Sequence, residues 1–231
     1  MIPDLHGFGP ALVAGTWMTI QLALASLALG LVLGLLGALA KTSPLAALRW
    51  LGGTYSTIVR GVPELLWVLL IYFGTINLIR WIGQLFGIEN LALSPFAAGT
   101  IALGLCFGAY ATEVFRGALL AIPKGHREAG LALGLGKSRI FLRLILPQMW
   151  RLALPGLGNL FMILMKDTAL VSVIGLEEIM RRAQIAVTAS KEPFTFFLVA
   201  AVIYLCLTVV AMIGMHFLEK RAGRGFVRSA A

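Results

Sequence analysis

A long uncharged stretch near the N-terminus limits what this chain can fold into. No Asp, Glu, Lys or Arg occurs from Leu5 to Ala40, whereas about 20 apolar residues are enough for a helix to cross the hydrocarbon core of a membrane. Charged residues make up only 13% of the chain, and a soluble domain carries about 25%. The chain is therefore expected to be a membrane protein. Because the opening "MIPDLHGFGP" contains an acid and no Lys or Arg, the first helix is expected to be retained and not cleaved as a signal peptide.

Further apolar stretches predict an all-α membrane protein with five transmembrane helices in a single domain, residues 1–231. Lys166 and Asp167 lie inside the fourth span, which is expected to be interrupted near 166–168. The spans are expected at about 11–40, 56–79, 95–115, 152–176 and 194–218.

Basic residues gather on one side of these spans. The segments 41–60, 116–151 and 219–231 together hold 14 Lys and Arg, whereas the segments on the opposite side hold four. Cytoplasmic loops carry the excess of Lys and Arg, so the N-terminus is expected in the periplasm and the C-terminus in the cytoplasm. The net charge of +9 is then explained by basic helix ends, and we expect no nucleic-acid partner.

The run "GLGKS" at residues 134–138 looks like the end of a phosphate-binding loop. Such a loop needs a glycine five residues before Gly136, where this chain has Leu131. The run also follows a predicted membrane helix and a Pro-Lys-Gly turn, whereas a phosphate-binding loop follows a buried strand. We therefore expect the chain to bind neither ATP nor another cofactor, and to have no catalytic residues.

A longer pattern covers the same region. Glu128-Ala129-Gly130 is followed by Gly134 and then by Leu144-Ile145-Leu146-Pro147. This pattern resembles the cytoplasmic EAA loop of ATP-binding-cassette (ABC) importer permeases, with Gly130 in place of the second alanine and Leu144 in place of isoleucine. The resemblance implies a type I ABC importer permease fold. It also implies a cytoplasmic coupling loop, residues 120–147, that docks in a groove of an ATPase subunit.

The same resemblance implies which residues contact the ATPase. Basic side chains at Lys137, Arg139 and Arg143 would keep the loop near its partner, and the alternative is that they contact only lipid headgroups. The expected coupling residues are Glu128, Ala129, Gly130, Gly134, Lys137 and Arg139.

The resemblance extends over nearly the whole chain. The segments 55–66, 108–129, 166–178 and 192–204 resemble polar-amino-acid permeases, in particular membrane subunits of importers for histidine, lysine, arginine and ornithine. It implies a location in the bacterial inner membrane, in contact with membrane lipid. It also implies a homologous second permease subunit in a heterodimer, two ATPase subunits that bind ATP and Mg, and a periplasmic amino-acid-binding protein.

Ionisable residues in the spans independently indicate an amino-acid ligand, because charges at membrane depth usually line a polar path. Lys166 could meet the substrate carboxylate, while Asp167 and Glu64 could meet the amino and side-chain cations. Thr168 and backbone groups freed at the interruption would add hydrogen bonds. Glu113 pairs at i, i+3 with Arg116, so it is expected in a structural or gating pair, with direct substrate contact as the alternative.

Glu64 carries the argument for a basic substrate, namely histidine, arginine, lysine or ornithine. Many similar permeases have an apolar residue at this point of the motif, and an acid there favours a cationic side chain. Alternatively, Glu64 pairs with Arg60 or with another subunit, and Lys166 and Asp167 form a salt bridge. Pro63 is expected to bend the helix.

Other functions remain open. Glutamine or another polar amino acid is an alternative cargo, and a membrane enzyme or signalling component is an alternative class. The three histidines have no second ligand at metal spacing, so no metal site is expected.

Overall fold

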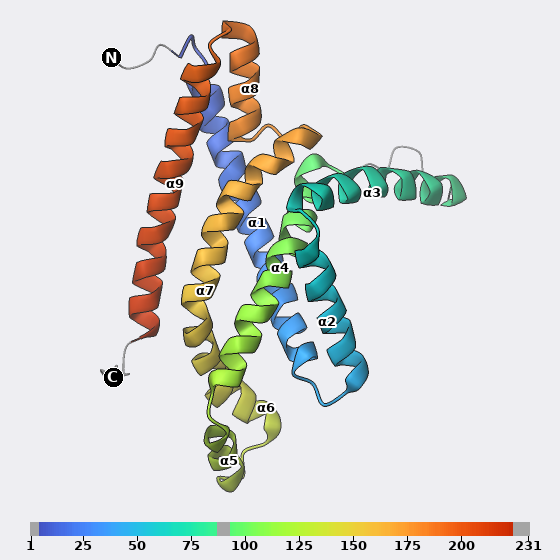
Figure 1. Ribbon diagram of the computed structural model, residues 1–231, viewed down its shortest axis with the longest axis vertical. Helices are drawn as coiled ribbons and strands as arrows, with labels where there is room; N and C mark the ends of the chain where they lie inside the picture. The colour runs from blue at the N-terminus through green and yellow to red at the C-terminus, as the bar shows by residue number, and fades with distance from the viewer. Residues whose placement is uncertain (1–4, 87–92, 224–231) are drawn as a thin grey trace.

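The computed structural model describes residues 5–86 and 93–223, and every regular element in these ranges is a helix. Most of them run roughly parallel or antiparallel along one long axis (Figure 1). The elements are α1 (Gly9–Lys41), α2 (Ala46–Gly61), α3 (Glu64–Phe86), α4 (Pro95–Ala121), α5 (Lys124–Ala132), α6 (Lys137–Ile140), the π-helix η1 (Phe141–Ile145), α7 (Leu146–Asp167), the 3-10 helix η2 (Thr168–Ile174), α8 (Ile179–Ser190) and α9 (Pro193–Ala222).

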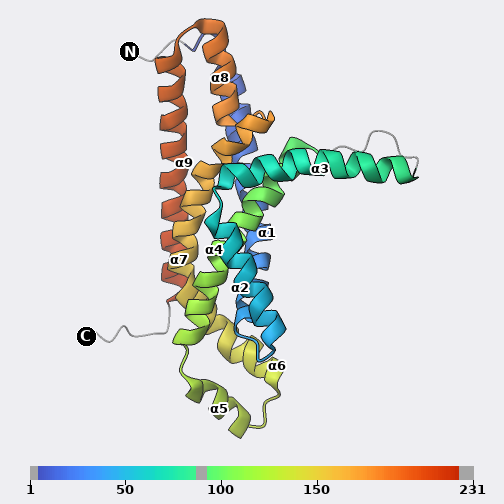
Figure 2. The ribbon, with the colours of Figure 1, turned by 45° about the vertical axis from the view of Figure 1, so that its right-hand side comes forward.

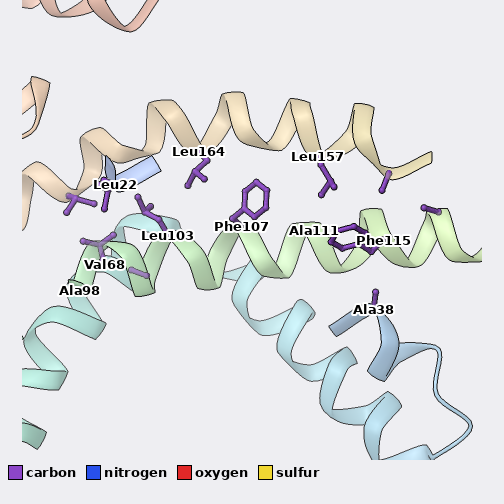
Figure 3. Close-up of a cluster of buried hydrophobic side chains, with 14 of the residues drawn as sticks. Leu22, Ala38, Val68, Ala98, Leu103, Phe107, Ala111, Phe115, Leu157 and Leu164 are labelled. Atoms are coloured by element: carbon purple, nitrogen blue, oxygen red, sulfur yellow. The ribbon is translucent and has the colours of Figure 1, made fainter. Parts of the chain in front are cut away.

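The helices α1 and α4 form the centre of the bundle. Their backbones approach closely because glycines face small residues across the contact; a Cβ atom on Gly34 would lie 2.6 Å from that of Ala111. Small residues at such crossings are how membrane helices pack tightly. On the other side of α4, Phe107 points toward Leu157 and Leu164 of α7 (Figure 3). The core is therefore a sandwich of α1, α4 and α7.

The second predicted span is a bent pair of helices. α2 ends at Gly61, α3 begins at Glu64, and the two are bent by 105°. Pro63 lies in this break, as expected for a residue that cannot continue the hydrogen-bonding of a helix. α3 consequently leaves the bundle sideways, almost perpendicular to α4, in both views (Figures 1 and 2). The described residues contain four helices able to span a membrane, and up to five if this bent pair counts as one span.

The fourth predicted span changes from an α-helix to a 3-10 helix. α7 ends at Asp167 and continues as the 3-10 helix η2, which stops at Gly175, whose φ is +93°. The sequence predicts an interruption near 166–168, whereas the helix continues through these residues with a change from α to 3-10 geometry. After it, Glu178 caps α8 by accepting hydrogen bonds from the backbone amides of Met180 and Arg181.

α9 lies on the outside of the bundle. Only 11% of its most apolar 18-residue stretch is buried, and it packs on α7 and α8. Its apolar outer surface suits lipid. The short helices α5 and α6 lie at the opposite end of the bundle from α8 (Figure 1).

Candidate functional site

The two carboxylates predicted to meet substrate cations line one cavity. Glu64 is the first residue of α3, directly after the bend at Pro63, and Asp167 is the last residue of α7, where the α-helix passes into the 3-10 helix η2. Tyr110 and Cys106 of α4 complete the polar part of the lining. The cavity holds about 20 Å³, enough for one water molecule, which needs roughly 10–15 Å³. This volume is too small to enclose an amino acid.

Tyr110 ties this cavity to its surroundings. Its hydroxyl donates a hydrogen bond of 3.2 Å to Oε1 of Glu64. The guanidinium of Arg60 lies over the Tyr110 ring, 5.3 Å from its centroid, in the geometry of a cation–π contact. Tyr110 is not among the predicted site residues, although it lies three residues before Glu113 in the segment 108–129. A phenol one helical turn from a membrane carboxylate is the signal that could have found it.

Lys166 and Thr168 flank Asp167 but lie outside this lining. Lys166 is exposed. Thr168 is fully buried, and its hydroxyl donates to the backbone oxygen of Met165 at 2.7 Å. The structure thus brings Glu64 and Asp167 together in one cavity, and the side chains of Lys166 and Thr168 do not line it.

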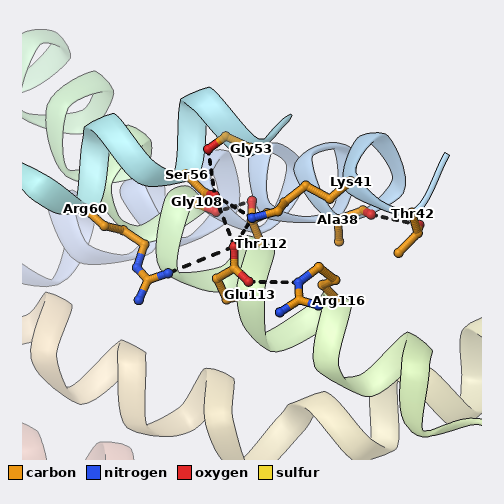
Figure 4. Close-up of polar contacts among 10 residues, drawn as sticks. All are labelled: Ala38, Lys41, Thr42, Gly53, Ser56, Arg60, Gly108, Thr112, Glu113 and Arg116. Carbon is orange, nitrogen blue, oxygen red and sulfur yellow. Dashed lines mark hydrogen bonds and ion pairs between the residues drawn. The ribbon is translucent and has the colours of Figure 1, made fainter. Parts of the chain in front are cut away.

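Glu113 is the centre of a separate polar network (Figure 4). Its Oε1 accepts a hydrogen bond from the Lys41 ammonium and lies 3.1 Å from the Ser56 hydroxyl. Its Oε2 accepts from Nε of Arg116 at 2.9 Å, which is the predicted i, i+3 pair. Arg60 approaches to 4.0 Å. One carboxylate therefore connects α1, α2 and α4. Lys41 and Ser56 were not foreseen, because they are 72 and 57 residues away in sequence.

Arg60 links the network to the cavity, although it does not line the cavity itself. This side chain reaches Glu113 on one side and the ring of Tyr110 on the other. A continuous set of polar contacts thus leads from Lys41, at the end of α1, to Glu64 in the cavity.

The predicted coupling residues form a compact loop. Glu128 and Ala129 lie exposed on α5, and Gly130 is buried against α6 and η1. A Cβ atom on Gly130 would lie 2.9 Å from Cγ1 of Ile140, so only glycine lets the two helices meet this closely. Gly134 has φ of +70°, and it turns the chain after α5.

Two basic coupling residues follow this turn. Lys137 is the first residue of α6 and Arg139 lies within it, and both are exposed. The glycine-rich run at 134–138 thus joins two helices. The backbone oxygen of Gly130 accepts a hydrogen bond of 3.0 Å from the amide of Leu135, which fixes the turn between them.

Apolar helices long enough to span a membrane, with a folded loop at one end of the bundle, are the architecture of a membrane transport component. The chain belongs to the family described as binding-protein-dependent transport system inner membrane component, which matches residues 30–224. It is accordingly an inner-membrane permease component of an amino-acid ABC importer.

Named relatives agree with this assignment. The chain is 44% identical to the octopine transport system permease protein OccQ of Rhizobium meliloti, over 97% of this chain and 98% of the relative. It is 41% identical to the histidine/lysine/arginine/ornithine transport system permease protein HisQ of Escherichia coli (strain K12), over 97% and 99%. It is 46% identical to the nopaline transport system permease protein NocQ of Agrobacterium fabrum, over 96% and 95%.

Solved structures share the architecture. A chain from the crystal structure of an amino acid ABC transporter with histidines superposes with a TM-score of 0.78 at 30% identity, covering 96% of this chain and 100% of that one. A chain of the MetNI methionine ABC transporter superposes with a TM-score of 0.72 at 19% identity, covering 92% and 96%. The second likeness concerns the fold alone.

Proposed function

We propose that this chain forms half of the translocation path of an ABC importer for basic amino acids: histidine, arginine, lysine and ornithine. The observation that carries the proposal is that Glu64 of α3 and Asp167 of α7 line one cavity from two different helices. A basic amino acid presents two positive groups, and two carboxylates held apart by the backbone match them. Glutamine has only one positive group, so it would leave one carboxylate in the cavity without a partner, which is unfavourable at membrane depth.

Each predicted site residue has a role in this proposal. Glu64 and Asp167 bind the side-chain and amino cations, and Lys166 binds the substrate carboxylate once the path opens. Thr168 contributes through the backbone of η2, because its hydroxyl is already bonded to Met165. Glu113 holds α1, α2 and α4 together beside the path.

The orientation follows from charge. With basic loops in the cytoplasm, the N-terminus and α8 lie on the periplasmic side, where a periplasmic amino-acid-binding protein delivers substrate. The loop of α5, α6 and η1 lies on the cytoplasmic side and docks on an ATPase subunit. ATP and Mg are bound by two such subunits, and a homologous permease subunit supplies the other half of the path.

Transport in this proposal requires only two conformations with different affinities. ATP binding draws the coupling loops together. α4 and α7 flank the loop directly, so its displacement tilts both helices and separates them from α3. The cavity between Glu64 and Asp167 then widens to admit substrate, and ATP hydrolysis restores the narrow state.

Uptake by the assembled importer in proteoliposomes tests the proposal. Glu64→Gln and Asp167→Asn preserve shape and remove charge. A hydrogen bond to a charged group contributes about 1.5–3 kcal/mol, so each variant should lower arginine and histidine uptake by about tenfold or more. The matched control is Glu219→Gln, which removes a carboxylate at the far end of α9.

Competition between amino acids tests which substrate the importer prefers. Glutamine, octopine and nopaline are offered as competitors against labelled arginine. Undiminished arginine uptake in both cavity variants would remove the site assignment, and stronger competition by glutamine, octopine or nopaline than by unlabelled arginine would identify a different cargo.

A further inference from the structure

A second cavity lies at the end of the bundle, between the coupling loop and the ends of α1 and α4. It holds about 370 Å³, within the usual range of ligand pockets, about 300–1,000 Å³. Lys124, Arg127 and Lys137 line one part of it, and apolar side chains such as Leu39, Leu120 and Phe141 line the rest. It shares no lining residue with the cavity of Glu64 and Asp167. The proposed substrate path does not use this cavity, although one lining residue, Lys137, is also a predicted ATPase-coupling residue.

The charge of this cavity is of one sign. The described residues that line it include three cations and no carboxylate. Two of the cations, Lys124 and Arg127, stand in the first turn of α5, which has no acidic residue and no side-chain cap. Cations at the start of a helix oppose its dipole. An anion in the cavity would offset both the mutual repulsion and the unfavourable dipole contact.

The apolar part of the lining distinguishes between anions. Leu39 comes from the last turns of α1 and Leu120 from the last turn of α4, so the apolar part continues the surface of two spans. The Leu120 side chain is 65% exposed. A free inorganic anion would use only the basic part of the cavity. A phospholipid would use both, because its phosphate and its acyl chains are joined.

We infer that this cavity binds an anionic phospholipid of the cytoplasmic leaflet, with its phosphate between Lys124, Arg127 and Lys137 and its upper acyl chains on Leu39, Leu120 and Phe141. Basic pockets at the cytoplasmic ends of membrane helices are suited to such headgroups. The inference rests on the orientation given in the proposed function. A bound lipid would brace α5 and α6 against α1 and α4, and would stiffen the loop that transmits the motion of the ATPase.

Native mass spectrometry of the assembled importer tests the inference. The complex is stripped of lipid in detergent and titrated with dioleoylphosphatidylglycerol, and retained lipids are counted. A basic residue near an anionic lipid surface is worth about 1 kcal/mol, or about fivefold in affinity. The variant Lys124→Gln/Arg127→Gln/Lys137→Gln should therefore bind at least one phosphatidylglycerol on the order of 100-fold more weakly.

Matched controls separate the cavity from charge in general. Arg143→Gln/Lys220→Gln/Arg221→Gln removes the same charge from exposed positions outside the lining, and it should retain the lipid. Phe141→Ala should weaken binding of the lipid but leave binding of inorganic phosphate unchanged, because it removes only an apolar contact.

Three results would overturn the inference. Equal phosphatidylglycerol counts in wild type and in the lining variant would exclude the site, and displacement by millimolar inorganic phosphate would identify a site for free anions. Loss of the ATPase subunits from the lining variant with an unchanged lipid count would assign the cavity to the ATPase interface. Lipid counting requires no transport, so its failure is distinguishable from failure of the uptake experiment.

Discussion

The hydroxyl of Tyr110 donates a hydrogen bond to the carboxylate of Glu64 across 3.2 Å, and so joins the middle of α4 to the first residue of α3. The donor lies on a helix that leads directly into the loop proposed to dock on the ATPase, because α4 ends at Ala121 and α5 begins at Lys124. Any tilt of α4 therefore acts on the position of a carboxylate proposed to bind substrate.

Tyr110→Phe should lower the apparent affinity for arginine in uptake, although both carboxylates remain. The lost hydroxyl leaves Glu64 less firmly positioned, and we expect the half-saturating arginine concentration to rise about three- to tenfold, as for loss of one hydrogen bond of about 0.7–1.4 kcal/mol, within the usual range. Concentration-dependent uptake in proteoliposomes measures the change. Tyr72→Phe is the control, since it removes a phenol hydroxyl of α3 that does not line the cavity. An identical response of the two variants would contradict a specific role for Tyr110.

The pair of Lys41 and Glu113 should show energetic coupling. Both side chains are about one-fifth exposed, so either single variant, Lys41→Met or Glu113→Gln, leaves a half-buried charge without its main partner. Coupled neighbours typically interact by about 0.5–3 kcal/mol. We expect the double variant to be less destabilised than the sum of the singles by about 1 kcal/mol, within the range usual for contacting residues. Unfolding in detergent at several denaturant concentrations gives the values, and strict additivity would count against the network.

Gly134→Ala should impair coupling more than Gly136→Ala. Gly134 has φ of +70°, and Gly136 has φ of −67° with no atom within 4 Å of an added Cβ. A left-handed conformation costs an alanine roughly 1–2 kcal/mol, so the first substitution distorts the turn between α5 and α6 and the second leaves it intact. The ratio of amino acid transported to ATP hydrolysed should fall in Gly134→Ala alone. Equal ratios in both variants would separate this turn from coupling.

Glu178 should make stability depend on pH. Burial raises the pKa of this carboxyl, which lies between η2 and α8, although hydrogen bonds from Met180, Tyr204 and Arg181 act in the opposite direction. The folded protein then binds the proton more tightly than the unfolded chain does. Its stabilising contribution is complete below the unfolded pKa of about 4.3 and is lost as the pH rises through the raised folded pKa.

The comparison of wild type with Glu178→Gln isolates this carboxyl. As the pH rises from 4 toward neutrality, the unfolding temperature of wild type should fall relative to that of Glu178→Gln. A difference that stays constant over this range would show that Glu178 does not titrate as described.

The bend between α2 and α3 could be predicted from sequence, whereas the contacts between helices could not. Pro63 indicated the bend because proline cannot continue a helical hydrogen-bond pattern. At Lys166 and Asp167 the sequence predicted an interruption, and the helix instead changes to 3-10 geometry without a break. The membership in an importer family followed from the spacing of Glu128, Gly134 and Pro147.

The rotation of each helix about its axis required the structure. α1 and α9 are apolar around nearly their whole circumference, so no periodic pattern identifies the face that packs. For this reason Lys41 was not paired with Glu113 in advance. The rotation of the helix at the end of α7 could not be predicted either, so the sequence did not show that Thr168 is buried and Lys166 exposed.

The sideways course of α3 has a mechanical consequence. Its 23 residues form a rod that is about 35 Å long at 1.5 Å per residue, and it meets the bundle at Glu64, beside Pro63. Glu64 therefore lies at the point about which α3 would rotate relative to the bundle. A rotation of α3 about this point would turn the Glu64 carboxylate toward or away from Asp167, while the backbone of Glu64 would hardly move.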